Sequence, residues 1–165
     1  MAAHDNENKT IDINYRIKMK NGELLNRMLT LAVNAHSGQF DKSGNPYILH
    51  VLKVLHYVRS SDEELNCIAV GHDLFEDTSV TANDLYNLGM TKRIVDAIFC
   101  LTKMPGQTYN EYKDAVFSNK DAMIVKKSDL RHNSDIRRLK GITEKDIQRM
   151  VKYHNFYVEI EEKLI

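Results

Sequence analysis

The sequence has few cysteines, no excess of either charge and no long apolar run. Its two cysteines, Cys67 and Cys100, lie in apolar stretches, which is typical of reduced core residues and argues against a disulfide framework. Lys plus Arg and Asp plus Glu both number 23, and this balance argues against a dedicated binder of long nucleic acid. No apolar run approaches the ~20 residues of a membrane span, so no membrane association is expected.

The first ten residues, MAAHDNENKT, are polar and lack the apolar core of a signal peptide. We therefore expect a soluble cytoplasmic protein. The 165 residues suffice for one domain with its own hydrophobic core, and no repeat, low-complexity tract or linker divides them. We predict an N-terminal extension over residues 1–20 and a single domain over residues 21–165.

Helical periodicity runs through nearly all of the predicted domain. Leu24, Met28, Leu31 and Ala35, for example, are spaced at intervals of three and four, as in an amphipathic helix. This pattern predicts an all-α fold, a compact helical bundle. We expect helices over residues 23–36, 47–60, 61–77, 81–89, 91–103, 109–118, 121–139 and 143–164.

Cap residues support several of these boundaries. Ser61 or Asp62 is a suitable N-cap for the third helix. Gly89 is expected to close the fourth helix. Thr143 and Asp146 fit the capping arrangement of a last helix.

The segment GHDLFEDT, residues 71–78, places four ionisable side chains directly after the apolar run NCIAV. On a continuous helix, His72 would lie next to Glu76, and Asp73 would lie next to both Glu76 and Asp77. The apolar neighbours would bury much of this ridge, and a buried carboxylate requires a partner or a cation. Imidazole and carboxylate together suit a divalent transition metal. The alternative interpretation is a solvated helix end.

A second polar cluster, KKSDLRHN, follows the apolar run AMIV. Asp129 and Asn133 are four residues apart and share a helix face. Asp129 could supply a further metal ligand, and Asn133 could hold a substrate group. A pair of exposed polar residues is the alternative.

Two histidines are candidates for the remaining ligand. His50 lies on an apolar helix within PYILHVLKV, where a hydrogen-bonded core histidine is the more common situation. His36 lies at a helix end within NAHSGQ. The spacing alone does not choose between the two.

Three segments, AHSGQFDKSGNPYILH, GHDLFEDT and VKKSDLRHN, occur in this order. They resemble the HD-domain phosphohydrolases of the RelA/SpoT type, both the hydrolase half of these proteins and the small stand-alone alarmone hydrolases. The resemblance covers about residues 25–157. It implies an HD-type helical fold and a metal-dependent enzyme that removes the 3′-pyrophosphate from a (p)ppGpp-like alarmone. It also implies one divalent metal ion, Mn²⁺, and a small-molecule nucleotide as the substrate.

The resemblance also implies roles for individual residues. Glu76 and Asp77 match the catalytic acid pair of the family, and His36 would lie outside the ligand set as a neighbour of the pocket. The implied metal ligands are His50, His72, Asp73 and Asp129. The residues expected to contact the nucleotide or its phosphates are Lys42, Lys126, Asn133, Arg149 and Tyr153.

The sequence departs from the family pattern at Asp41, where the family has an Arg associated with the nucleotide base. Asp cannot stack on a base as a planar guanidinium does, and it reverses the charge. This departure motivates an alternative, an HD phosphohydrolase that acts on a different nucleotide or phosphoester. A non-catalytic nucleotide-binding module is a further alternative.

Overall fold

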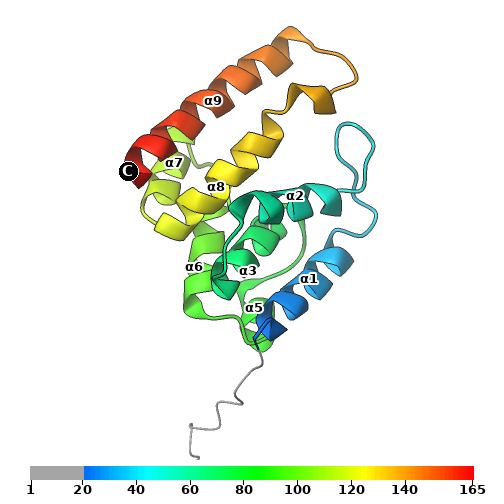
Figure 1. Cartoon of the computed structure of the whole chain (residues 1–165), viewed down its shortest axis with the longest axis vertical. Coiled ribbons are helices and arrows are strands. Elements are labelled where there is room, and N and C mark those ends of the chain that lie inside the picture. Colours follow the sequence, from blue (N-terminus) through cyan, green and yellow to red (C-terminus); the bar gives the residue numbers. More distant parts are fainter. Residues whose placement is uncertain (1–20) are drawn as a thin grey trace, which may run out of the picture.

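The computed structural model describes residues 21–165, and this part of the chain is helical without a β-strand (Figure 1). The predicted all-α fold is confirmed. The predicted N-terminal extension, residues 1–20, lies outside the described residues. The helices are α1 Glu23–Ala35, α2 Ile48–Val58, α3 Glu63–Gly71, α4 Leu74–Asp77, α5 Ala82–Asn87, α6 Lys92–Leu101, α7 Tyr109–Phe117, α8 Lys120–Asn133, the 3₁₀ helix η1 Ile136–Arg138, and α9 Glu144–Leu164.

The prediction of one continuous helix over residues 61–77 is wrong. Helix α3 ends at Gly71 and α4 begins at Leu74, so the His72–Asp73 pair lies at the break between them. The His72 side chain donates from Nδ1 to the carbonyl oxygen of Ala69 at 2.8 Å. A continuous helix would offer that carbonyl to the backbone N–H of Asp73. The histidine therefore competes with the helix for its own acceptor.

The helix expected over residues 121–139 is also shorter than predicted. Helix α8 ends at Asn133, and η1 follows after a short turn. Asp135 has an extended backbone, and its side chain accepts a hydrogen bond from the backbone N–H of Arg137. This side-chain cap begins η1 in a new direction and brings it toward the loop between α1 and α2 (Figure 1).

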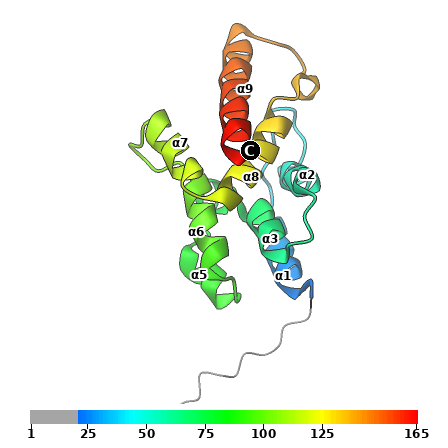
Figure 2. The same ribbon diagram turned by 60° about the vertical axis from the view of Figure 1, so that its left-hand side comes forward.

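Helix α8 occupies the centre of the fold and packs against α2, α3, α6, α7 and α9. Helix α9 lies alongside α8 in both views (Figures 1 and 2). Gly71 lies where α3 crosses α6, and a Cβ atom there would be 2.7 Å from the Ile98 Cδ1 atom. Only glycine allows this close approach without a shift, and the approach places the next residue, His72, against the core.

The predicted caps are mostly confirmed. Asp62, rather than Ser61, caps α3 by accepting from the backbone N–H groups of Glu64 and Leu65. Thr143 and Asp146 form a reciprocal capping box at the start of α9.

Both cysteines are free thiols. Cys67 is fully buried, and Cys100 is half-buried at the edge of the core. No helix in residues 21–165 combines the length and the apolar character that crossing a membrane requires.

Candidate metal centre

Four predicted ligands converge at one point, although they come from three separate parts of the chain. His50 comes from α2, Asp129 from α8, and His72 and Asp73 from the break after α3. The Nε2 atoms of His50 and His72 lie 3.3 Å apart. The Asp129 Oδ1 atom is 3.2 Å from Nε2 of His50, and the Asp73 Oδ2 atom is 2.9 Å from Nε2 of His72.

The outer nitrogen of each imidazole is held by a partner. His72 donates from Nδ1 to the Ala69 carbonyl, so a neutral His72 directs the lone pair of Nε2 toward the centre. The Nδ1 atom of His50 lies 2.7 Å from the Nδ1 atom of His132. Ligating histidines in proteins are oriented in this way by an acceptor on the second nitrogen.

The carboxylates of the centre are also oriented by neighbours. The Tyr47 hydroxyl donates to the Asp73 Oδ2 atom at 2.6 Å. Asp129 accepts from Lys126 Nζ on Oδ2 at 2.8 Å and from Asn133 Nδ2 on Oδ1 at 2.6 Å. The predicted pairing of Asp129 and Asn133 on one helix face is confirmed, and the fixed carboxylates keep the donor atoms of the centre close together.

The electrostatics of the centre favour a bound cation. Burial alone would raise the pKa of the Asp73 carboxyl, but the charges and hydrogen bonds of His72 and His50 outweigh burial and lower it. Burial alone would lower the pKa of the His50 imidazole, but Asp129 and Asp73 raise it to about 9. Two ionised carboxylates thus hold protons on buried imidazoles, and metal binding here competes with those protons.

His50, His72 and Asp129 form a buried group able to hold a metal ion, since their donor atoms lie within 4.8 Å of one another. Asp73 adds a second carboxylate beside both imidazoles. A mixed set of imidazole nitrogens and carboxylate oxygens suits a first-row divalent metal. The residues present therefore fit the divalent ion implied by the sequence.

The two acidic residues after the metal centre are exposed, which corrects the expectation that this ridge is largely buried. Glu76 and Asp77 line a cavity of about 250 Å³, which we call the metal-side cavity. The Glu76 Oε2 atom accepts from the backbone N–H of Lys103 at 3.0 Å. Asp77 is exposed as a whole, but its carboxyl is partly desolvated within the cavity, and this desolvation and the nearby Asp73 carboxylate raise its pKa. The same cavity is lined by the cationic residues Lys103, Lys126 and Lys152.

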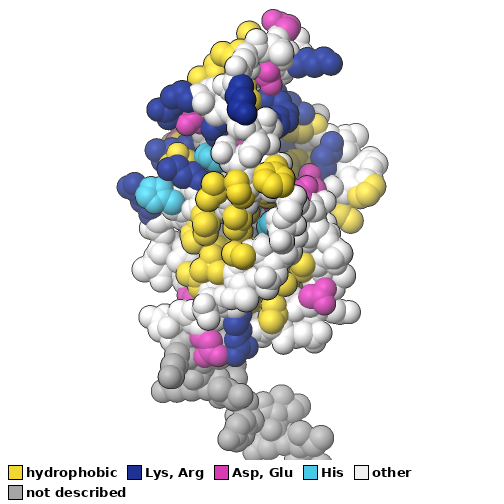
Figure 3. Space-filling view, turned by 90° about the vertical axis from the view of Figure 1, so that its right-hand side faces the viewer, with side chains coloured by type: hydrophobic (Ala, Val, Ile, Leu, Met, Phe, Trp, Pro, Cys, Tyr) yellow, Lys and Arg dark blue, Asp and Glu magenta, His cyan; other side chains and the backbone are white. Residues whose placement is uncertain are grey.

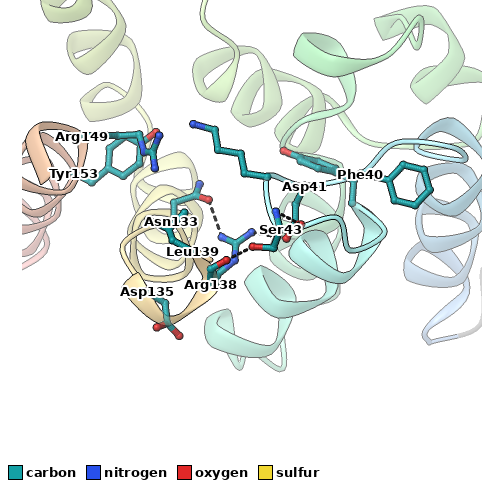
Figure 4. Close-up of a pocket in the computed structure, with 11 residues that line it drawn as sticks. Phe40, Asp41, Ser43, Asn133, Asp135, Arg138, Leu139, Arg149 and Tyr153 are labelled. Carbon is teal, nitrogen blue, oxygen red and sulfur yellow. Dashed lines mark hydrogen bonds and ion pairs between the residues drawn. The ribbon is translucent and has the colours of Figure 1, made fainter. Parts of the chain in front are cut away.

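A second cavity of about 220 Å³ adjoins the first, and we call it the loop-side cavity (Figure 4). It lies between the loop 39–47, η1 and the start of α9. Tyr47, Asn133 and Tyr153 line both cavities. Lys42 and Arg149, two of the predicted nucleotide contacts, line only the loop-side cavity.

Figure 3 shows Lys and Arg side chains gathered on the upper part of this face of the molecule. In the orientation of Figure 1, the upper part is formed by η1 and the start of α9. Lys42, Arg138 and Arg149 line the loop-side cavity, as Lys103, Lys126 and Lys152 line the metal-side cavity, and a phosphorylated ligand suits such a cationic lining.

No family model matches the chain. The guanosine-3′,5′-bis(diphosphate) 3′-pyrophosphohydrolase of Vibrio cholerae is 30% identical over 106 residues, which cover 62% of this chain and 15% of that protein. The bifunctional (p)ppGpp synthase/hydrolase SpoT of Escherichia coli K12 is 30% identical over 103 residues, or 61% of this chain and 14% of the relative. The chain thus matches about one seventh of the length of these relatives.

A solved structure described as a metazoan ortholog of SpoT that hydrolyses ppGpp superposes with a TM-score of 0.70. It is 21% identical, and the match covers 88% of this chain and 93% of that one. The chain has the HD-domain fold. It resembles SpoT-type ppGpp hydrolases in sequence and in fold.

His36 lies near the metal centre but outside the group of converging donor atoms. It is buried, donates from Nδ1 to the Gln39 Oε1 atom at 2.7 Å, and packs its ring 5.1 Å from that of Tyr47. Of the two rival histidines, the structure thus brings His50 to the centre and places His36 behind Tyr47.

Several residues of the site had no part in the sequence predictions. Tyr47 and His132 contact proposed ligands directly, and Lys103 and Lys152 add charge to the metal-side cavity. Arg138 lines the loop-side cavity. His132 follows Asp129 by three residues, and this spacing was a local signal in the sequence. The contact of His132 with His50 on α2 depends on the tertiary fold.

Proposed function

We propose that this HD domain is a metal-dependent nucleotide pyrophosphohydrolase that removes the 3′-pyrophosphate from a (p)ppGpp-like alarmone. The observation that carries the proposal is the convergence of His50, His72, Asp73 and Asp129 beside a cavity with two acids and three lysines. The names of the relatives in Vibrio cholerae and Escherichia coli support the same reaction.

The two cavities suit the two ends of such a substrate. The pyrophosphate would enter the metal-side cavity, where Lys103, Lys126 and Lys152 can neutralise its charge. The nucleoside would extend into the loop-side cavity past Asn133 and Tyr153, which line both. Lys42, from the loop 39–47, and Arg149, from α9, would then contact the nucleotide in the loop-side cavity.

His50, His72, Asp73 and Asp129 would hold one divalent ion, for which Mn²⁺ is our proposal. The ion would supply Lewis-acid neutralisation of phosphate charge and would acidify water. Lys126 also contacts Asp129, so it can keep that carboxylate oriented while it faces the substrate.

Glu76 and Asp77 are proposed to handle the proton of the attacking water. The raised pKa of Asp77 makes its carboxylate a better proton acceptor than an ordinary aspartate near neutral pH. Glu76 is anchored through its contact with the Lys103 backbone, so its second carboxylate oxygen can orient the water. We place this reaction in the cytoplasm, with a small-molecule substrate and no membrane or long nucleic acid as partner.

A second candidate is the hydrolysis of a different nucleotide or phosphoester at the same site. The specific observation is that the Asp41 carboxylate is fully engaged, with Oδ1 accepting from the backbone N–H groups of Ser43 and Asn45 and Oδ2 accepting from Arg138. The loop 39–47 therefore offers no guanidinium of its own at position 41 to a base. The third alternative, a non-catalytic nucleotide-binding module, has the same metal centre but predicts binding without turnover.

The test is a substrate panel on purified protein loaded with Mn²⁺, with metal content measured. The panel contains ppGpp, ppApp and nucleotides with other phosphate positions, and pyrophosphate release is followed. We expect release from ppGpp or ppApp, and loss of release in Asp73→Ala. Turnover of another nucleotide alone would favour the second candidate. Tight binding with no turnover by metal-loaded protein would favour the binding module.

A further inference from the structure

A chain of hydrogen bonds joins the wall of the loop-side cavity to the metal centre. Arg138 donates from one terminal nitrogen to the Asp41 Oδ2 atom at 3.1 Å and from the other to the Asn133 Oδ1 atom at 3.1 Å. Asn133 in turn donates from Nδ2 to the Asp129 Oδ1 atom at 2.6 Å. Figure 4 shows the Asp41, Arg138 and Asn133 side chains meeting at the floor of this cavity.

The contact with Arg138 decides which way the Asn133 amide points. A guanidinium is only a donor, so it requires the amide oxygen, and this leaves the amide N–H₂ group toward Asp129. The oxygen of Asp129 that accepts from Asn133 is the one nearest to Nε2 of His50. Arg138 therefore acts on the metal centre through a single intermediate side chain.

Arg138 also keeps capacity for a ligand. Three of the five N–H groups of its guanidinium donate to Asp41, Asn133 and the carbonyl oxygen of His132. Within residues 21–165, the remaining two have no hydrogen-bond acceptor, and the side chain lines the loop-side cavity. These N–H groups suit a phosphate or carbonyl oxygen of a nucleotide. The negative charge of Asp41 is meanwhile paired with the same guanidinium.

We propose that Arg138 is a positioning residue that couples occupancy of the loop-side cavity to metal binding. A nucleotide that engages its free N–H groups would stabilise the orientation in which Asn133 holds Asp129 for the metal. By linkage, a bound metal would strengthen nucleotide binding by the same factor. The nucleotide part of this inference rests on the proposed function, whereas the effect of Arg138 on metal affinity does not.

The experiment compares Arg138→Ala with the control variant Arg137→Ala. Arg137 is an exposed neighbour of Arg138 and pairs with Asp135. Mn²⁺ affinity is measured without nucleotide by competition with a fluorescent chelator, after circular dichroism has checked the fold. Removing a positive charge near the centre should tighten cation binding by simple electrostatics. Positioning predicts the opposite sign, a loss of about tenfold in Arg138→Ala, the lower end of the range for residues that orient metal ligands.

Arg138→Lys separates charge from geometry. A lysine keeps the charge but lacks the planar fork that reaches Asp41, Asn133 and the His132 carbonyl together. We expect it to bind Mn²⁺ about as weakly as Arg138→Ala. Mn²⁺ affinity in Arg138→Ala and Arg138→Lys equal to or tighter than that of Arg137→Ala would overturn the proposal.

Coupling is measured by repeating the titration with GDP and with ADP, the nucleotides that would remain after 3′-pyrophosphate removal from ppGpp and ppApp. At least one should raise the Mn²⁺ affinity of the unmodified protein and of Arg137→Ala, and have a smaller effect in Arg138→Ala. An equal effect in all three proteins would overturn the coupling. An inactive protein that still shows the metal-affinity difference would count against the proposed reaction and leave the positioning role supported.

Discussion

The Nδ1 atoms of His132 and His50 lie 2.7 Å apart, and the two rings are inclined by only 21° with their centroids 4.9 Å apart. One of these nitrogens must donate to the other. Burial, Arg138 and His50 lower the pKa of His132 to about 4, so His132 is neutral near pH 7 and can accept. In its neutral form, the state that binds a metal, His50 then carries its proton on Nδ1 and presents the lone pair of Nε2 to the metal centre.

His132→Leu should therefore weaken Mn²⁺ binding by about 10- to 100-fold, the usual effect of removing a partner that orients a ligating histidine. His132→Gln retains an acceptor oxygen and should recover part of the affinity. The matched control is His56→Leu, which removes an exposed histidine from α2. Competition with a fluorescent chelator measures the Mn²⁺ affinity of all three variants. Unchanged affinity in His132→Leu would show that His50 is oriented by packing alone.

The acid pair should separate catalysis from metal binding. Glu76→Gln and Asp77→Asn keep the size of each side chain but remove its capacity to accept a proton. We expect each to lower kcat by about 10²- to 10⁴-fold, the typical contribution of general acid–base catalysis. Metal content, measured on the same samples, should stay near one ion per chain, because neither residue is among the converging donor atoms. Full turnover in both variants would contradict the assignment.

Metal loading should stabilise the fold, because the four proposed ligands join α2, α8 and the break after α3. At a free Mn²⁺ concentration of 100 times Kd, the gain in unfolding free energy should be about 2.7 kcal/mol. Differential scanning fluorimetry with Mn²⁺ and with EDTA measures the shift in Tm. Asp73→Asn removes one charged donor with little change in volume, and its Tm should respond far less to Mn²⁺. An equal response would place the ion elsewhere.

The parts of the structure that sequence predicted well depend on local interactions. The helical spacing of Leu24, Met28 and Leu31 and the capping box of Thr143 and Asp146 involve residues within one helix, so both were predictable. The break after Gly71 was missed because helical periodicity does not reveal that the His72 side chain binds the Ala69 carbonyl. Its consequence is that Asp73 reaches the metal centre from a turn rather than from a helix face.

The supporting contacts of the site were beyond prediction from one sequence. His50 and His132 are 82 residues apart, and Asp41 and Arg138 are 97 residues apart. Both contacts depend on how α8 and η1 pack against α2 and the loop 39–47. The resemblance to the family implied the proposed ligands by their motifs, but it gave no sign that Asp41, a departure from that pattern, pairs with Arg138.

A pH effect on stability should arise away from the metal centre, at Arg93. Its guanidinium bonds to Asp62 at the start of α3 and to Asp121 at the start of α8, both at 2.7 Å. The hydrogen bond from Arg93 is the main cause of the lowered pKa of Asp62, opposed by burial. A lowered folded-state pKa contributes stability above the unfolded value of about 3.9, and this contribution is lost as pH falls through the folded value.

Arg93→Gln should thus lower the unfolding free energy at pH 7 by about 1 kcal/mol, since the group is partly exposed and solvent screens it. The difference in unfolding free energy from the unmodified protein should shrink as the pH is lowered below about 4, because a protonated Asp62 has no negative charge for the arginine to stabilise. Urea unfolding of both proteins at pH 7 and at pH 3, with EDTA present at each pH, measures this difference in unfolding free energy. Lys92→Gln, which removes an exposed i,i+4 pair with Asp96 on the same helix, is the control and should change stability less. A difference for Arg93→Gln that stayed constant across this range would mean that the arginine acts through packing rather than through its carboxylate partners.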